Sequence, residues 1–211
     1  MKFVQLISFV FITMILFSCK KEDTFVIVET EYGAIKMKLY DSTPKHKENF
    51  LKLIKEGYYD DLLFHRVIKN FVIQGGDPDS KNATPEALLG NGGPDYTIPA
   101  EIEALHYRGA LAAARKGDAE NPEMASSGSQ FYIVQGGLLK EEDIKLTGNT
   151  YTQEQINQYL KVGGTPDLDG KYTVFGEVVE GMEVVDSIAN TQIGVASRPL
   201  KDIKMKIKIV E

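Results

Sequence analysis

The spacing of hydrophobic residues changes along the chain, and each spacing predicts a different kind of element. Residues 34–40 and 203–209 alternate apolar with polar side chains, which is typical of half-buried β-strands. From Pro44 to Gly57 the apolar residues recur at helical spacing, which predicts a helix. A second helix is expected over Met182–Ala189. Further short apolar runs predict strands over residues 25–30, 63–68, 71–74, 110–114, 131–134 and 173–178.

Many short strands with two helices predict a mainly β fold, either a closed barrel or a sandwich. A chain of 211 residues is long enough to bury one core of ordinary size. Residues 138–166 interrupt the pattern because they are mostly polar. Within them, Thr152 and Gln155 have the spacing of a capping box, which predicts one short surface helix. We therefore expect a single domain with an insertion that has no separate core.

The first 18 residues differ in composition from the rest of the chain. They hold one charge, Lys2, followed by a mostly apolar stretch that is typical of a secretory signal and short for a membrane-spanning helix. The stretch ends Leu-Phe-Ser-Cys, which resembles a bacterial lipobox with Cys19 as the lipidated residue. The alternative is a cleaved signal whose boundary happens to carry a cysteine. We expect a signal peptide over residues 1–18, lipidation at Cys19, a tether over residues 19–24, and an exported protein anchored in the cell envelope, facing the periplasm or the cell surface.

Composition and spacing argue against several classes of function. One cysteine excludes an intramolecular disulfide framework and a multi-cysteine zinc site. A net charge of −6 argues against a protein that binds nucleic acid by neutralising phosphates. His46, His65 and His106 form no His-x-x-x-His pair, so we expect no metal site. The glycine-rich residues 90–94 lack the following Lys-Ser/Thr of a phosphate-binding loop, so we read them as a turn.

Two other stretches point to a peptide-binding groove. Residues 64–77 place an arginine, two phenylalanines and a glutamine on neighbouring predicted strands. In residues 127–133 the alternation puts Gln130 and Tyr132 on one face. Ordinary strand packing would explain either stretch alone. Together they suggest a groove with an apolar floor and a polar rim, which suits an extended peptide.

These stretches resemble those of cyclophilin-type peptidyl-prolyl isomerases. The resemblance covers residues 25–211 and implies a closed eight-stranded antiparallel β-barrel capped by two α-helices, with residues 138–166 as a short helical insertion. It also implies an enzyme that accelerates rotation of X–Pro bonds without a metal or cofactor. The motifs that carry it are the Phe-His-Arg-Val-Ile…Phe-Val-Ile-Gln-Gly-Gly-Asp run of residues 64–77, Gly109–Ala114, Gly128–Phe131 and Leu168–Gly176.

The same resemblance assigns site residues. Arg66 is implied as the catalytic residue. Tyr132 stands where the best-known eukaryotic members have phenylalanine, and Asp167 stands where they have a tryptophan that contacts cyclosporin. The pocket is therefore expected to keep its apolar character and to bind that inhibitor poorly. The residues implied to bind substrate are His65, Phe71, Val72, Gln74, Ala114, Arg115, Gln130, Tyr132, Leu168 and Tyr172.

The expected partners are proline-containing segments of unfolded or flexible exported proteins, whose folding the enzyme would assist. We expect a monomer that binds no nucleic acid and is attached to the membrane by its lipid. One rival hypothesis is a peptide-binding chaperone or scaffold lipoprotein that uses the groove without turnover. Another is a structural envelope lipoprotein whose insertion at residues 138–166 docks a partner.

Overall fold

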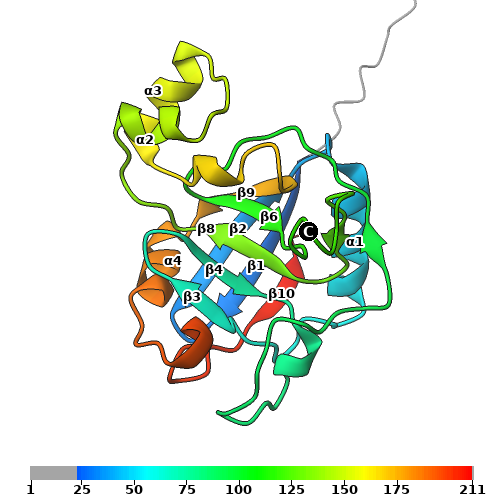
Figure 1. Cartoon of the computed structure of the whole chain (residues 1–211). Helices are drawn as coiled ribbons and strands as arrows, with labels where there is room; N and C mark the ends of the chain where they lie inside the picture. The colour runs from blue at the N-terminus through cyan, green and yellow to red at the C-terminus, as the bar shows by residue number, and fades with distance from the viewer. Residues whose placement is uncertain (1–22, 211) are drawn as a thin grey trace, which may run out of the picture.

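The structure is a computed structural model that describes residues 23–210, and its strands form two antiparallel sheets (Figure 1). The large sheet has eight strands in the order β10-β1-β2-β9-β6-β8-β4-β3. The predicted signal peptide, Cys19 and most of the predicted tether lie outside the described residues. The strands of the large sheet are β1 (Thr24–Thr30), β2 (Gly33–Leu39), β3 (Arg66–Ile68), β4 (Val72–Gly75), β6 (Ala110–Ala113), β8 (Phe131–Val134), β9 (Val174–Glu180) and β10 (Lys206–Ile209), and β5 (Thr97–Ile98) pairs with β7 (Ser126–Ser127) in the small one.

The large sheet curls into a half-barrel whose two edge strands do not pair with each other. Within residues 23–210, the segments that precede β3 and β10 are joined by an isolated bridge between Leu63 and Lys204. Three backbone hydrogen bonds also join them, from Phe64 N to Ile203 O at 2.9 Å, from Met205 N to Leu62 O at 2.8 Å and from Asp61 N to Met205 O at 3.1 Å. Asp61 has a φ of 67°, which lies outside the β region and prevents a regular strand there. The expectation of a fully closed barrel is therefore wrong at this seam.

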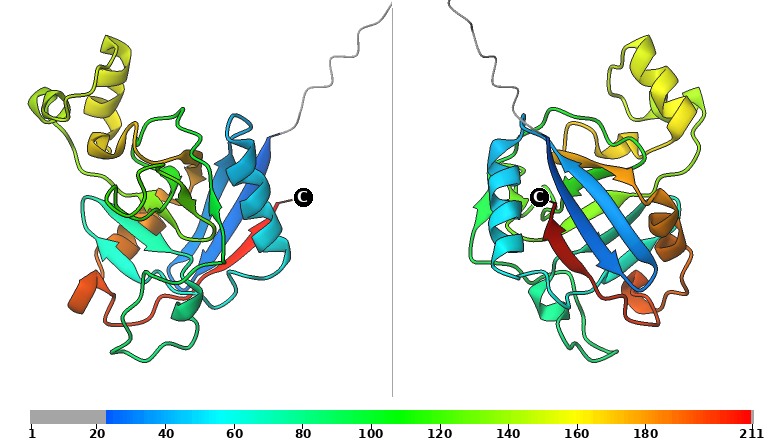
Figure 2. Two further views of the ribbon diagram at one scale, coloured as in Figure 1. Left: turned by 45° about the vertical axis from the view of Figure 1, so that its right-hand side comes forward. Right: turned by 180° about the vertical axis from the view of Figure 1, so that it is seen from behind.

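Two helices cover opposite sides of the curled sheet, α1 (Pro44–Lys55) and α4 (Met182–Ala189), as predicted (Figures 1 and 2). Proline stands at the first helical position of α1, where no amide N–H is needed. The Glu101 carboxylate accepts hydrogen bonds from the backbone N–H groups of Lys45 and His46 at 3.2 and 3.1 Å. A side chain distant in sequence therefore caps this helix. Short 3₁₀ helices occur at η1 (Pro78–Ser80), η2 (Pro166–Leu168) and η3 (Val195–Ser197).

Strands β4, β6 and β8 are buried on both faces. Ile73, Leu111 and Ile133 face the main core, which also contains Phe50 and Phe131 with ring centroids 5.5 Å apart. The alternate residues of the same strands belong to a second apolar cluster on the other face. This double burial explains why these strands appear in the sequence as continuous apolar runs. The buried members of the second cluster are Val72, Ala110, Ala112, Ala114, Tyr132, Val134 and Val174.

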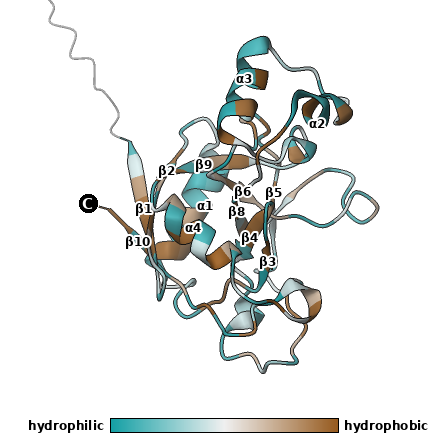
Figure 3. Ribbon diagram, turned by 90° about the vertical axis from the view of Figure 1, so that its left-hand side faces the viewer, coloured by the Kyte–Doolittle hydropathy of each residue, from teal (hydrophilic) through white to brown (hydrophobic). Residues whose placement is uncertain are grey.

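The insertion contains two helices, α2 (Glu141–Leu146) and α3 (Gln153–Val162), where the sequence predicted one. The capping box is confirmed, because Gln155 N donates to Thr152 Oγ1 at 3.3 Å and Thr152 N donates to Gln155 Oε1 at 2.8 Å. The two helices project from the sheet, and α3 is mainly hydrophilic (Figure 3). Among residues 23–210, no helix combines the length and apolar character needed to cross a bilayer.

Candidate active site

The site is built on a row of residues that are paired across four neighbouring strands. Arg66 of β3 is opposite Gln74 of β4, which is opposite Tyr132 of β8, which is opposite Ala112 of β6. Residues paired in this way point to the same face of a sheet. The strand register therefore sets a guanidinium, an amide and a phenol side by side on the face that carries the second apolar cluster.

A relay of hydrogen bonds holds the Arg66 guanidinium in place. Arg66 Nη1 donates to Gln74 Oε1 at 3.0 Å, and Gln74 Nε2 donates to Gln130 Oε1 at 3.0 Å. Gln130 Nε2 then donates to the carbonyl oxygens of Gly90 and Gly92 at 3.0 and 2.7 Å. Each amide is thereby fixed in one orientation. Because Arg66 uses only one of its five N–H donors in this relay, the others remain available to a bound peptide.

The relay depends on a glycine. A Cβ atom at position 92 would clash with the carboxylates of Asp77 and Asp79. Only glycine therefore allows the loop to approach closely enough for its carbonyl to accept from Gln130. The motif interpreted from sequence as a simple turn thus anchors the polar rim of the groove.

An apolar cluster lies beside Arg66. The Arg66 guanidinium carbon is 5.8 Å from the centroid of the Phe71 ring. Tyr132 and Tyr172 form one wall, with ring centroids 6.0 Å apart and planes at 78°. We use the name proline pocket for the six members of this cluster that the resemblance implies to bind substrate, and their contact with a proline stays a prediction: Phe71, Val72, Ala114, Tyr132, Leu168 and Tyr172.

The hydroxyl of Tyr132 enters a buried polar network. His106 Nδ1 lies 2.9 Å from Asp169 Oδ1, and a carboxylate can only accept, so Nδ1 carries the proton. His106 Nε2 is therefore an acceptor, and the Tyr132 hydroxyl donates to it at 2.9 Å. Burial raises the pKa of Tyr132 well above its ordinary value, which keeps this hydroxyl protonated.

Comparison with known proteins agrees with this geometry. Residues 25–209 match the family model described as cyclophilin type peptidyl-prolyl cis-trans isomerase/CLD. The chain belongs to the cyclophilins. A relative from Staphylococcus saprophyticus subsp. saprophyticus, which bears the name peptidyl-prolyl cis-trans isomerase, is 39% identical over 189 residues, covering 88% of this chain and 91% of its own length. A relative of the same name from Staphylococcus epidermidis is 38% identical over 188 residues with the same coverage.

Solved cyclophilin structures share the fold. A cyclophilin-type isomerase from Cryptosporidium parvum superposes with a TM-score of 0.67 at 29% identity, covering 90% of this chain and 99% of its own. A second crystal structure of that protein, obtained in the presence of the dipeptide Ala-Pro, gives a TM-score of 0.66 at the same identity and covers 89% and 99% of the two chains. The chain is thus a peptidyl-prolyl cis-trans isomerase.

The structure of this cyclophilin brings together most of the residues that the sequence singled out. Arg66, Gln74 and Gln130 form the relay, and six others belong to the apolar cluster named the proline pocket, while the roles of all nine stay predictions. Arg115 is adjacent but engaged elsewhere, because its guanidinium lies 4.6 Å from the Tyr172 ring centroid and its Nε donates to Lys171 O at 2.8 Å. Its role in binding substrate stays a prediction.

His65 lies apart from the proline pocket. It is buried beneath β3, and neither ring nitrogen makes a hydrogen bond of ordinary geometry with any residue from 23 to 210. Burial lowers its pKa to about 4, so the ring is neutral at pH 7.

Sequence reasoning missed the residues behind Tyr132. His106, Tyr151 and Tyr159 belong to none of the motifs quoted from the sequence. Asp169 lies in the motif of residues 168–176, but only the hydroxyl on Tyr132 indicated that a partner was needed.

Proposed function

We propose that this cyclophilin catalyses X–Pro rotation in exported or envelope proteins, with Arg66 as the catalytic residue. The observation that carries the proposal is the placement of the Arg66 guanidinium, which Gln74 orients at 3.0 Å next to the proline pocket. A proline ring in that pocket would bring its amide nitrogen to the edge where Arg66 stands. An apolar pocket beside a fixed donor is what catalysis of this rotation requires.

The chemistry follows from the electronic structure of the amide. Resonance gives rotation a barrier of about 18–20 kcal/mol. Twisting the bond breaks the conjugation, so the prolyl nitrogen gains a lone pair that accepts a hydrogen bond. Arg66 supplies it, because a guanidinium is always protonated and presents its donors in a rigid fork. A hydrogen bond to a charged group contributes roughly 1.5–3 kcal/mol, which corresponds to about ten- to hundredfold acceleration.

The remaining acceleration is assigned to binding. The proline pocket removes the ring and the amide from water, and a twisted amide is less polar than a planar one, so it loses less hydration. Gln74 and Gln130 offer polar atoms that would hold the substrate backbone while the far side of the bond turns. Rotation makes and breaks no covalent bond, so no side chain has to gain or lose a proton.

The test is exchange NMR spectroscopy on an Ala-Pro peptide with the wild type, Arg66→Ala and Arg66→Lys. We expect Arg66→Ala to lower kcat/KM by about ten- to hundredfold, and Arg66→Lys to recover only part of the loss, because a mobile ammonium replaces a fixed fork. Equal acceleration by all three proteins would contradict the role of Arg66. Binding of the peptide without acceleration by the wild type would favour the chaperone hypothesis.

The location in the cell envelope is proposed from the pattern of residues 1–19. A signal followed by Cys19 supports lipid attachment. Metabolic labelling with a fatty acid should mark the wild type and leave Cys19→Ala unlabelled. Label that persists in the variant would contradict the lipid anchor without affecting the proposed catalysis.

A further inference from the structure

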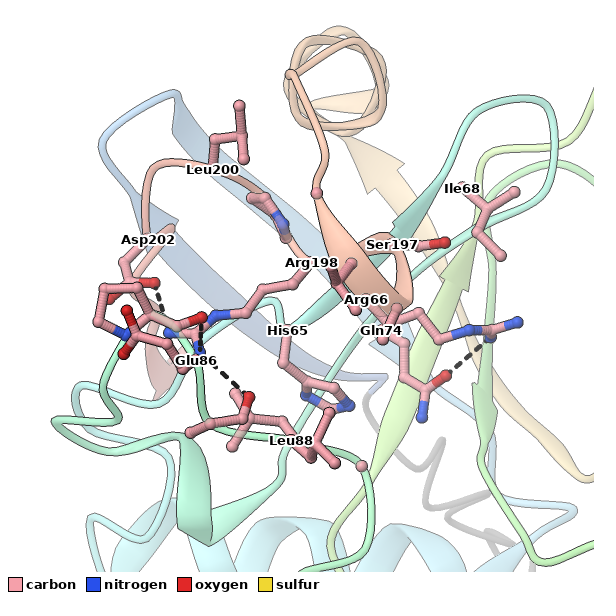
Figure 4. A pocket seen from close by; sticks show the side chains of 18 residues that line it. His65, Arg66, Ile68, Gln74, Glu86, Leu88, Ser197, Arg198, Leu200 and Asp202 are labelled. Carbon is pink, nitrogen blue, oxygen red and sulfur yellow. Dashed lines mark hydrogen bonds and ion pairs between the residues drawn. The ribbon is translucent and has the colours of Figure 1, made fainter.

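A second pocket adjoins the other side of the Arg66 relay. It has a volume of about 1030 Å³ and lies between β3, the loop of residues 85–90 and the segment of residues 194–202 (Figure 4). Arg66 and Gln74 line it as well, so it is continuous with the candidate active site. Its size is that of a site for a ligand or for several residues of a peptide. We call it the flanking pocket.

The rim of the flanking pocket is apolar and exposed. Leu88, Val195 and Leu200 line it, and their exposed fractions are 79, 84 and 69%. Two arginines line the flanking pocket, Arg66 and Arg198. Arg198 is engaged by the protein itself, because its Nη2 donates to Asp202 at 2.9 Å and its Nη1 donates to Thr84 O at 2.7 Å. Arg198 therefore holds the two walls together.

His65 supplies an unpaired polar group at the base of this pocket. Its side chain is only 3% exposed, and its ring is directed toward the Leu88 side of the pocket (Figure 4). A neutral imidazole offers one donor and one acceptor, and neither of its nitrogens makes a hydrogen bond of ordinary geometry with the described residues. A buried polar group without a partner destabilises the fold, so its presence beside a pocket points to a partner that a ligand provides.

Strained backbone adds an independent indication. Ala196 and Ser197 have φ values of 54° and 59°, in the left-handed region that L-residues with side chains avoid. Such conformations cluster at ligand-binding sites, where the surrounding structure maintains them. Both residues line the flanking pocket.

We propose that the flanking pocket binds a large side chain of the substrate close to the isomerised proline, with tyrosine preferred. This inference rests on the proposed function, because it requires a peptide that already contacts Arg66. The apolar rim suits an aromatic ring, and the unpaired imidazole suits a hydroxyl, which can both donate and accept. The pocket thereby gives the enzyme a preference among X–Pro sites.

The experiment compares peptides that contain an Ala-Pro unit and carry tyrosine, phenylalanine or alanine at one varied position. The varied position is one of the two residues before the Ala-Pro unit or one of the two residues after it. Burying an aromatic ring should raise kcat/KM about tenfold over alanine for at least one position, mainly through KM. Tyrosine should exceed phenylalanine, and His65→Phe should abolish that difference while the preference for an aromatic ring persists. Leu88→Ser should weaken the preference for an aromatic ring, whereas Leu146→Ser, at an equally exposed leucine of α2, should not.

Two outcomes would overturn the flanking pocket. One is equal kcat/KM for all three side chains at every position. The other is a preference that both His65→Phe and Leu88→Ser leave unchanged. Neither outcome resembles a failure of the proposed function, in which even the alanine peptide is not accelerated.

The buried network behind Tyr132 carries a second, independent inference about the insertion. Asp169 Oδ2 accepts hydrogen bonds from the hydroxyls of Tyr159 and Tyr151 at 2.6 and 2.8 Å. Both tyrosines belong to the insertion, and the other carboxylate oxygen holds His106, which holds Tyr132. Of these residues, Tyr159 and His106 are fully buried. A continuous chain of hydrogen bonds therefore links the insertion to the wall of the proline pocket.

We infer that Tyr159 and Tyr151 are positioning residues for the proline pocket. Their hydroxyls hold the Asp169 carboxylate in place. The carboxylate sets the tautomer of His106, and His106 orients the Tyr132 ring through its hydroxyl. The insertion thus acts on the enzyme's own site, a different role from docking a partner.

A double-mutant cycle tests this inference. Tyr159→Phe keeps the ring and removes one hydrogen bond, and it should raise KM by roughly two- to tenfold while kcat changes less. In a Tyr132→Phe background the hydrogen bond from Tyr132 to His106 is already absent, so the same substitution should have no further effect on KM. Equal effects in the two backgrounds would show that Tyr159 acts only through general stability, and no effect in either would also overturn the inference.

Discussion

The two pockets that share Arg66 differ in how completely their polar groups are paired. Behind the proline pocket, Tyr132, His106 and Asp169 satisfy one another within 3 Å. In the flanking pocket, His65 is equally buried, yet its ring makes no hydrogen bond of ordinary geometry with residues 23–210. A satisfied network specifies one geometry, as a pocket for one fixed ring requires. An unsatisfied group is suited to a site whose occupant differs from substrate to substrate.

The largest effect on stability is expected when the carboxylate at the centre of the satisfied network is removed. Asp169→Ala would leave the donors of His106, Tyr151 and Tyr159 without an acceptor, and each buried donor costs about 1–3 kcal/mol. We expect the free energy of unfolding to fall by roughly 3–6 kcal/mol, measured by urea denaturation. The control is Asp167→Ala, two residues earlier on an exposed side chain, which should change stability by less than about 0.5 kcal/mol. Similar losses for both variants would refute the importance of the network.

The unpaired histidine should make the protein sensitive to acid. In the unfolded chain a histidine has a pKa of about 6.5, whereas in the folded protein burial lowers the pKa of His65 to about 4. Between these values the unfolded state binds the extra proton, so stability decreases as the pH falls from 6.5 to 4. The loss amounts to about 3 kcal/mol below pH 4.

The measurement compares wild type with His65→Phe in urea at pH 7 and pH 4. The difference in unfolding free energy between the two proteins should shift by about 3 kcal/mol in favour of the variant at the lower pH. Parallel pH profiles would mean that His65 has a partner or a hydrated environment.

Two substitutions compare the pockets at neutral pH, because each removes polar atoms from one buried ring. Tyr132→Phe deprives His106 Nε2 of its donor and should destabilise the protein by about 1 kcal/mol. His65→Phe removes nitrogens that have no partner, and should stabilise the protein by about 1 kcal/mol. Thermal unfolding at pH 7 measures both. If both variants were destabilised, or both stabilised, the two rings would not differ in hydrogen bonding as their contacts indicate.

The smallest effect is expected at the rim of the flanking pocket. Leu88→Ser should change the free energy of unfolding by less than about 0.5 kcal/mol, because the side chain is 79% exposed and contributes little to the core. Urea denaturation of the variant beside the wild type provides the measurement. A decrease of more than about 2 kcal/mol in the free energy of unfolding would mean that Leu88 is packed like a residue of the core.

Features that depend on near neighbours in sequence were predictable. The alternation of residues 34–40 gave β2, the proline at position 44 marked the start of α1, and Thr152 with Gln155 gave the cap of α3. The groove residues came from motifs whose resemblance to cyclophilins is strong, and the strand register explains why Arg66, Gln74 and Tyr132 end on one face.

Features that depend on distant partners were not predictable. Asp169 stands in a Leu-Asp-Gly turn, and nothing local to it indicates two tyrosines 10 and 18 residues away or His106, 63 residues away. The open seam was missed for a similar reason. It depends on the left-handed backbone of Asp61, which no alternation of apolar and polar residues reveals.

The order of strands has a consequence for the protein while it is being synthesised. β1 is the first strand to emerge from the ribosome, and it lies between β2 and the last strand, β10, with Val26 opposite Ile209. Until residues 206–209 have been synthesised, one edge of β1 therefore has no partner and offers its backbone to any extended chain nearby. A chain truncated before residue 206 would therefore keep that edge open and remain vulnerable to misfolding.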